Sequence, residues 1–165
     1  MGALRSYQLR WERRRHRLRS LRKSRELTLV RDRLTRVGPK DILLFSVVRN
    51  EKPRLSYFLK YYRQQGVSAF FFVDNDSTDG TRDYLERQPD VTLWHTSHSY
   101  KKARYGVDWI NGLLTAHAHQ HWTLVVDVDE FLVFPHCDTR NLHALTDWLD
   151  ASSIKSFGTT LIDMY

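Results

Sequence analysis

Short, nearly unbroken apolar runs alternate with amphipathic stretches along most of this chain. The runs at Ile42–Val48 and at residues 69–73 are rich in β-branched and aromatic residues, and shorter runs follow at Val91–His95 and at residues 122–126. Runs of this length and composition predict strands buried on both faces, as in a parallel sheet. A last apolar run at residues 159–162 predicts one more strand.

Helical periodicity fills the intervals between these runs. After the first predicted strand, apolar residues recur at helical spacing between Pro53 and Gly66, at Leu55, Phe58, Leu59 and Tyr62. Similar patterns predict helices over residues 107–117 and 142–149. Strands and helices that alternate in this way predict an α/β fold, with a mostly parallel, Rossmann-like sheet flanked by helices.

The first 38 residues follow a different pattern. Large apolar residues recur there at a spacing of seven, at Leu4, Trp11 and Leu18 and again at Leu27 and Leu34. Arginines fill most positions between them, so residues 3–36 predict one long basic helix. Gly38 and Pro39 end this pattern. We therefore expect a basic helical arm at residues 1–38 and a folded domain at residues 39–165.

The charge distribution separates the same two parts. Residues 1–40 hold 14 Lys and Arg against 3 Asp and Glu, whereas residues 41–165 hold 12 against 16. A basic amphipathic helix is attracted to anionic headgroups, so the arm predicts a partner in an anionic membrane surface. The alternative is a solvated or partner-packed extension. Nucleic acid is disfavoured, because the body offers no second basic patch with interleaved aromatics.

Cysteine content and hydropathy bear on the compartment. The single cysteine, Cys137, excludes an intrachain disulfide and fits a reducing compartment. No apolar run approaches the roughly 18–20 residues of a membrane span, and the arginine-rich N-terminus is unlike a secretory signal. We expect a cytoplasmic protein, peripheral at the inner face of the cell membrane.

Polar clusters follow three of the predicted strands. The clusters are Asn50 and Glu51, then Asp74 and Asp76, then Asp127, Asp129 and Glu130. Because the carboxyl ends of parallel strands meet at one edge of a sheet, these side chains are expected to line one cleft. Gathered carboxylates repel one another unless a cation compensates, which predicts Mn²⁺ or Mg²⁺ at the last cluster. The alternative, solvated loop acids that cap helices, suits Asp79 and Asp83.

These motifs, in this order and spacing, resemble family 2 glycosyltransferases of the GT-A fold. The likeness rests on Asn50-Glu51, on the segment 73–81 and on Asp127-Val-Asp129-Glu130-Phe, and the segment 103–111 resembles a bacterial subgroup. It covers roughly residues 41–165. It implies an enzyme of polysaccharide biosynthesis that transfers a sugar from a metal-bound nucleotide-sugar to a glycan or lipid-linked acceptor.

The resemblance also implies a role for each site residue. The nucleoside of the donor would contact Asn50, Glu51, Asp74 and Asp76. Asp127 would face the ribose or the metal, and Asp129 is the best single metal ligand. Arg104 is a candidate for the donor diphosphate, and a surface arginine beside Lys101 and Lys102 is the alternative.

The chain departs from the family at its end. Family members continue into an acceptor-binding half that supplies the general base, whereas this chain stops at Tyr165. We therefore expect a C-terminally short, donor-binding half with no assigned base. Glu130 and Asp163 lie at predicted strand ends and are the candidates for it, although a structural or metal-site role suits each of them better.

Two other functions fit parts of the pattern. One is a catalytically inactive nucleotide-binding module. The other is a phosphohydrolase of the haloacid dehalogenase type, which also has Asp-x-Asp after a buried strand but places it at the first strand, with a threonine where this chain has Phe131.

The histidines offer little chemistry by themselves. His117 and His121 have a zinc-compatible spacing, but no third ligand is evident, and a role at a helix C-terminus is favoured for them. His95 and His98 follow the third predicted strand and could line the cleft, with no partner to define a role.

Overall fold

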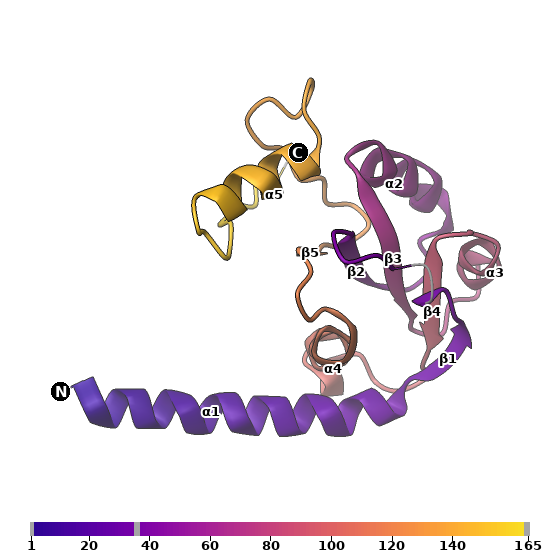
Figure 1. Cartoon of the computed structure of the whole chain (residues 1–165). Helices are drawn as coiled ribbons and strands as arrows, with labels where there is room; N and C mark the ends of the chain where they lie inside the picture. Colours follow the sequence, from indigo (N-terminus) through magenta and orange to yellow (C-terminus); the bar gives the residue numbers. More distant parts are fainter. Residues whose placement is uncertain (1, 35–36, 164–165) are drawn as a thin grey trace.

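A computed structural model describes residues 2–34 and 37–163, with the side chains of residues 2–4 and 6 outside the description. Its helices are α1 (Gly2–Lys23), α2 (Lys52–Gln64), α3 (Thr81–Glu86), α4 (Val107–His117) and α5 (Leu142–Ala151). Its strands are β1 (Thr28–Arg31), β2 (Ile42–Val48), β3 (Val67–Asp74), β4 (Val91–His95) and β5 (Thr123–Val125). Figure 1 shows α1 as a long rod that runs beneath α4 and extends away from the sheet.

The five strands form one sheet in the order β1-β4-β3-β2-β5. Strands β4, β3, β2 and β5 are parallel, and β1 pairs with β4 antiparallel at one edge. Helices connect the parallel strands, as crossover connections require. The predicted α/β fold, with a mostly parallel Rossmann-like sheet flanked by helices, is confirmed.

The register of the sheet aligns the strand ends. Val48 at the end of β2 lies opposite Asp74 at the end of β3, which in turn lies opposite His95 at the end of β4. On the other side of β2, Val125 of β5 lies opposite Phe45. The residues that follow these four strands therefore emerge at the same edge of the sheet.

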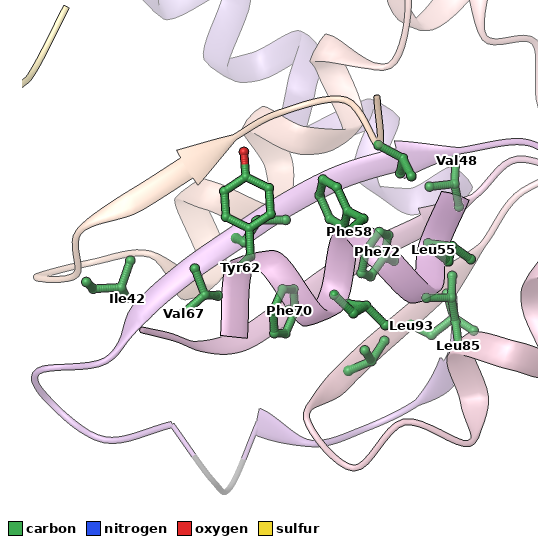
Figure 2. Packing of buried hydrophobic residues seen from close by; sticks show 14 of the residues in the cluster. Ile42, Val48, Leu55, Phe58, Tyr62, Val67, Phe70, Phe72, Leu85 and Leu93 are labelled. Carbon is green, nitrogen blue, oxygen red and sulfur yellow. The ribbon is translucent and has the colours of Figure 1, made fainter. Parts of the chain in front are cut away.

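Apolar side chains cover both faces of the central strands. On one face, Phe70 and Phe72 of β3 pack with Leu55, Phe58 and other residues of α2 (Figure 2). On the other face, the buried cluster joins residues of β2, β3, β4 and α4, among them Phe45, Phe71, Trp94, Trp109 and Leu113. Alternation of side chains along each strand explains why one phenylalanine-rich strand can supply both clusters.

The predicted helix over residues 3–36 is wrong beyond Lys23. Residues 28–31 form β1 instead, and Leu27 and Leu34 pack against the buried cluster on the α4 face. The spacing of seven between these leucines is also compatible with a strand and a loop that return to the core. Residues 35 and 36 lie outside the described residues. The division into an arm and a domain at residue 38 stays a prediction.

Two further predictions about strands are wrong. Strand β5 is not covered on both faces, because Val125 is 54% exposed. Within the described residues, β5 is an edge strand that pairs with β2. Residues 159–162 form no strand, and Leu161 and Ile162 are exposed. Apolar, β-branched composition favours a strand, but a strand forms only where a neighbour supplies hydrogen bonds. Met164 and Tyr165 lie outside the described residues.

Helix α1 docks on α4 through a buried carboxylate. Asp108 is fully buried, and its Oδ2 accepts a 2.7 Å hydrogen bond from Nε of Arg19. Oδ1 accepts from Nε of Arg104 at 2.9 Å. Burial alone would raise the pKa of Asp108, but the hydrogen bonds and charges of the two arginines outweigh it and hold that pKa below its usual range. The carboxylate therefore stays ionised and joins the two helices.

The two helices also approach closely through small residues. A Cβ added to Gly112 of α4 would lie 2.8 Å from Cβ of Ser24 and 3.2 Å from the carbonyl oxygen of Ser20. Ser20 is itself buried. None of the helices that the structure describes is long and apolar enough to cross a bilayer.

We expect Asp108→Asn to lower the free energy of unfolding by about 2–4 kcal/mol, because two arginines lose a buried anionic partner. Urea denaturation at neutral pH measures this. Asp147→Asn, an exposed acid on α5, is the matched control and should change stability by less than about 0.5 kcal/mol. Because the pKa of Asp108 is lowered in the fold, its contribution should disappear as the pH falls below the ordinary aspartate range. If the difference in unfolding free energy between Asp108→Asn and the wild type stayed the same in acid, this account would be contradicted.

Candidate functional site

A cleft of about 370 Å³ opens beside the carboxyl ends of β2 and β5. Its walls come from the segment before α4, from one face of α4 and from the residues that follow β5. They include Val47, Tyr100, Tyr105, Gly106, Val107, Ile110, Asn111, Leu114, Val126, Asp127 and Glu130. The mixture of apolar side chains with a few acids and an amide is typical of a small-molecule site.

Two tyrosines form one wall of this cleft. The rings of Tyr100 and Tyr105 meet edge to face with centroids 5.9 Å apart, and both side chains remain exposed. Gly106, with φ of 79°, allows this arrangement, since an added Cβ would lie 2.9 Å from both Tyr100 and Val47. Burial, and then the charge of Asp127, raise the pKa of Tyr100. Tyr100 therefore offers a neutral aromatic surface to a ligand.

The carboxylates that follow β5 form the opposite rim. Asp127 and Glu130 line the cleft. A tight turn holds them together: the Asp127 amide donates to Glu130 Oε2 at 3.1 Å, and the Glu130 amide donates to the Asp127 carbonyl at 3.0 Å. Partial desolvation and the nearby charges of Glu130 and Asp129 raise the pKa of Asp127. The charges of the neighbouring acids therefore disfavour the ionised form of Asp127.

Aromatic residues of α2 anchor the turn from behind. The ring of Phe131 packs against Tyr57, Phe58, Tyr61 and Tyr62, with centroids between 5.1 and 6.3 Å away. The Tyr62 hydroxyl donates to the Glu130 carbonyl at 3.1 Å and accepts from the amide of Leu132 at 3.0 Å. Burial raises the pKa of Tyr62 to about 12, so the phenol stays protonated and keeps both hydrogen bonds.

The acids do not converge on a complete metal cage. Within residues 2–34 and 37–163, no group of three His, Cys, Asp or Glu side chains is arranged to hold a metal ion. The chemistry at Asp127 nevertheless suits a hard cation, since its neighbours raise its pKa and the residue lines the cleft. Mg²⁺ is commonly held by one or two carboxylates with substrate phosphates and waters.

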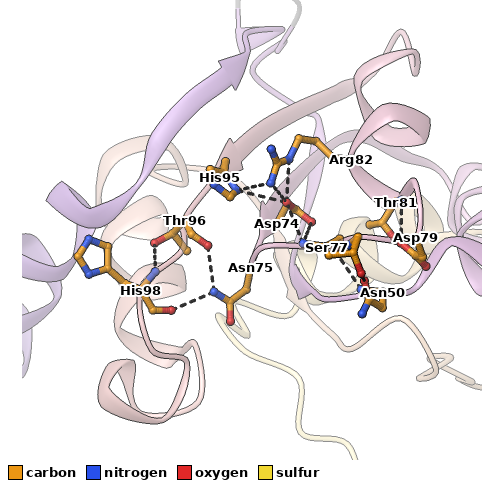
Figure 3. Close-up of polar contacts among 11 residues, drawn as sticks. Asn50, Asp74, Asn75, Ser77, Asp79, Thr81, Arg82, His95, Thr96 and His98 are labelled. Carbon is orange, nitrogen blue, oxygen red and sulfur yellow. Dashed lines mark hydrogen bonds and ion pairs between the residues drawn. The ribbon is translucent and has the colours of Figure 1, made fainter.

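The loops after β2 and β3 brace each other (Figure 3). The Asn50 amide donates to Ser77 Oγ at 2.9 Å, and Asn50 Oδ1 accepts from the Thr78 amide at 2.8 Å. The carboxylate of Asp79 accepts from the amides of Lys52 and Thr81, at the starts of α2 and α3. The capping role considered for Asp79 is thus observed, and Asn50 helps to hold the strand-end loops together.

Glu51 lies at the start of α2. Its carboxylate forms an ion pair with Arg54 at 2.7 Å, and its amide donates to Thr81 Oγ1 at 2.9 Å. Its charge also contributes to the raised pKa of Asp127, after the larger effects of burial, Glu130 and Asp129. Glu51 therefore lies within electrostatic reach of the acidic rim.

Asp74 and Asp76 have different surroundings. Asp74 is fully buried, and its Oδ2 accepts hydrogen bonds from Nε and Nη2 of Arg82 at 2.9 and 2.8 Å (Figure 3). His95 Nδ1 lies 3.3 Å from the same oxygen. Asp76 is exposed, with φ of 60°. The two were predicted as nucleoside contacts; of the pair, Asp76 is accessible, and Asp74 already holds an arginine.

Arg104 faces α1. Its guanidinium binds Asp108 and lies 3.0 Å from Nδ1 of His16. Its neighbour Tyr105 lines the cleft. Arg104, which was predicted to bind the diphosphate, thus lies next to the cleft with its charge already paired.

The remaining candidates also have definite positions. His117, the last residue of α4, packs at a tilt against the rings of Phe71 and Trp94. Burial lowers its pKa despite the charge of Asp32, so the imidazole belongs to the aromatic core and its role as a cation at the helix C-terminus stays a prediction. His121 lies beyond the end of α4, with Nδ1 3.0 Å from the Asp41 carbonyl. Asp163 is exposed in the C-terminal segment.

The aromatic parts of the site were not predicted. Tyr100 and Tyr105 lie on either side of residues 101–104, which include the predicted diphosphate ligand Arg104. In the sequence, their only distinguishing feature is that two tyrosines occur close to Gly106. The bonds from Tyr62 to the acidic turn join residues 68 and 70 positions apart, which no local pattern indicates.

Comparison with known proteins adds a partial similarity. No family model matches the sequence. A glycosyltransferase family 92 protein of Oryza sativa subsp. japonica is 29% identical over 98 residues, which is 54% of this chain and 16% of that protein. One of Arabidopsis thaliana is 26% identical over 103 residues, 58% of this chain and 17% of that protein. Both relatives are named glycosyltransferases.

The chain is thus similar to a part of two proteins named glycosyltransferases. These matches do not support the narrower assignment to family 2 or to its bacterial subgroup, because both relatives carry the name of family 92. The matched region spans about a sixth of each relative's length. The acidic motif follows β5 and not the first strand of the chain, which also counts against the phosphohydrolase alternative.

We expect Tyr62→Phe to lower the free energy of unfolding by about 1–3 kcal/mol, because the Leu132 amide and Glu130 carbonyl both lose a partner. Tyr57→Phe is the matched control, since Tyr57 also packs on Phe131 but its side chain is largely exposed. Thermal and urea denaturation of both variants measure the difference. Equal effects would contradict the proposed role of the phenol.

Asp127→Asn should leave stability unchanged or raise it by less than about 1 kcal/mol at neutral pH, because the side chain lies at the solvent-accessible rim of the cleft and is only partly desolvated. The folded state raises the pKa of this acid, so the ionised form disfavours folding and protonation favours it. Any gain in stability from Asp127→Asn should therefore vanish as the pH falls through the raised pKa of Asp127. Urea denaturation across pH 3–7, compared with the wild type, measures this. A clear loss of stability would show that Asp127 has a structural partner.

Proposed function

We propose that the chain forms the donor-binding part of a metal-dependent glycosyltransferase, in which the cleft binds a nucleotide-sugar and presents it to a glycan or lipid-linked acceptor. The observation that carries this proposal is the acidic rim around Asp127, beside an aromatic cleft at the carboxyl edge of a parallel sheet. Ligands of open α/β sheets bind at this edge. The similarity to two glycosyltransferases supports the same reaction class.

The cleft offers suitable surfaces for a nucleotide-sugar. The rings of Tyr100 and Tyr105 suit stacking against a base or a sugar, and Asn111 offers an amide to hydroxyl groups. Asn50, Glu51 and Asp76 would contact the nucleoside from the neighbouring strand ends, as in family 2 glycosyltransferases. Asp74 would act through Arg82, which it holds in place.

Asp129 and Asp127 would hold Mn²⁺ or Mg²⁺. Two carboxylates are a sufficient protein contribution when the donor diphosphate and waters complete the coordination. The bound cation would offset the charge that develops on the departing nucleoside diphosphate. The raised pKa of Asp127 supports this assignment, because a cation favours the ionised carboxylate that the fold disfavours.

Transfer would break the bond between the anomeric carbon and the diphosphate oxygen and form a bond from that carbon to an acceptor hydroxyl oxygen. The hydroxyl proton must pass to a base. Glu130 lines the cleft, but one of its oxygens accepts the Asp127 amide. Neither Glu130 nor Asp163 is assigned as this base, and the proposal concerns donor binding.

Isothermal titration with a panel of nucleoside diphosphates, with and without Mn²⁺, tests the donor site. We expect one nucleotide to bind in a Mn²⁺-dependent manner. Asp129→Ala should lower the affinity for this nucleotide by at least about tenfold, or about 1.4 kcal/mol. Tyr105→Ala should lower the affinity for the same nucleotide without removing the Mn²⁺ dependence of its binding.

Asp147→Ala on α5 is the control, since it removes an exposed acid from outside the cleft lining. Absence of binding by every nucleotide, or equal affinity of Asp129→Ala and the wild type, would overturn the donor assignment. Binding of nucleotide-sugar with no transfer to any acceptor would instead favour an inactive nucleotide-binding module.

A further inference from the structure

One side of helix α1 is fixed to the cleft wall. Arg19 binds the buried Asp108, and its Nη2 also donates to the Lys102 carbonyl at 3.0 Å. His16 contacts Arg104, and Ser20 is buried against α4. His16 and Ser20 fall on one side of the helix, within about 40° of each other at 3.6 residues per turn.

The opposite side of α1 carries an apolar stripe that faces solvent. Tyr7, Trp11 and Leu18 lie within about 40° of one another around the helix and roughly opposite Ser20. They are 61%, 51% and 68% exposed. The rings of Tyr7 and Trp11 meet edge to face, with centroids 6.3 Å apart. Large apolar side chains aligned in this way on a free surface indicate a partner.

The charge of α1 narrows the nature of that partner. The helix holds eight arginines and one lysine against a single acid, Glu12. Arg14 and Arg15 fall on either side of the apolar stripe. Charge alone would suit any polyanion, but the exposed tryptophan, tyrosine and leucine gain only where they can leave water. The headgroup region of an anionic bilayer satisfies both requirements at once.

Helix α4 connects this surface to the cleft. Its residues divide into three faces: Trp109 and Leu113 enter the core, Asp108 and Gly112 meet α1, and Val107, Ile110, Asn111 and Leu114 line the cleft. At about 100° per residue, the α1 face and the cleft face are adjacent. A surface bound by α1 would therefore have a fixed orientation relative to the cleft.

We propose that the outer face of α1, defined by Tyr7, Trp11, Leu18 and the flanking arginines, docks on an anionic lipid bilayer and holds the cleft in a fixed orientation to that surface. The expectation of a protein peripheral at the inner face of the cell membrane would follow, since that leaflet carries anionic lipids. Docking does not require nucleotide binding, so the two proposals can fail separately. Only the idea that this docking brings the cleft to a lipid-linked acceptor rests on the proposed function.

Sedimentation of the full chain with vesicles tests the docking surface. The wild type should bind vesicles that contain phosphatidylserine, bind phosphatidylcholine vesicles much more weakly, and dissociate as the salt concentration rises. The double variant Trp11→Ala/Leu18→Ala keeps every arginine and should lower the partition coefficient by at least about tenfold. Removal of residues 1–38 is a poorer test, because it also deletes β1 and uncovers α4.

Trp148→Ala supplies the matched control. Trp148 is 58% exposed on α5, and its loss should leave sedimentation unchanged. Equal binding of the double variant and the wild type, or equal binding to neutral and anionic vesicles, would overturn the proposal. So would tight binding of single-stranded RNA that the double variant retains, in place of vesicle binding, because it would assign α1 to a polyanion by charge alone. Circular dichroism confirms that each variant stays folded.

Discussion

Parallel pairing of β2, with β3 on one side and β5 on the other, is the constraint on which the site depends. It aligns Val48 with Asp74 and brings the residues after Val125 to the same edge. The polar segments after these strands are far apart in sequence, and only this pairing makes them neighbours. The cleft beside them follows from the geometry of a parallel sheet, in which the crossover helix α4 covers one face and begins at the carboxyl edge.

Four aspartates of this chain fall into two groups with different electrostatic surroundings. Asp74, Asp79 and Asp108 have donors within the fold: an arginine, backbone amides and two arginines, respectively. The fold lowers the pKa of Asp79 and of Asp108, so these two carboxylates stabilise the structure in their ionised form. Asp127 is the opposite case, since burial and the neighbouring acids disfavour its charge. An acid whose ionisation the fold opposes adds no stability in its ionised form.

The basic helix has a structural as well as a chemical role. Asp108 needs cationic partners because it is fully buried, and α1 supplies one of them through Arg19. The same helix leaves its aromatic side in solvent. One side of α1 packs on α4, and the opposite side carries exposed apolar residues. The helix can therefore be part of the fold and still present a surface to another partner.

Sequence alone was sufficient for the class of fold and for the order of most elements, because strand and helix periodicities are local properties. It also located Asp127 and Glu130 beside a strand end. It did not reveal that Asp74 is held by Arg82, that Tyr62 anchors the acidic turn, or that residues 28–31 leave the basic helix to pair with β4. Each of these depends on which distant residue becomes a neighbour. Hydrogen bonds and ion pairs of buried groups are satisfied across the tertiary structure, and a pattern along the chain does not specify the partner.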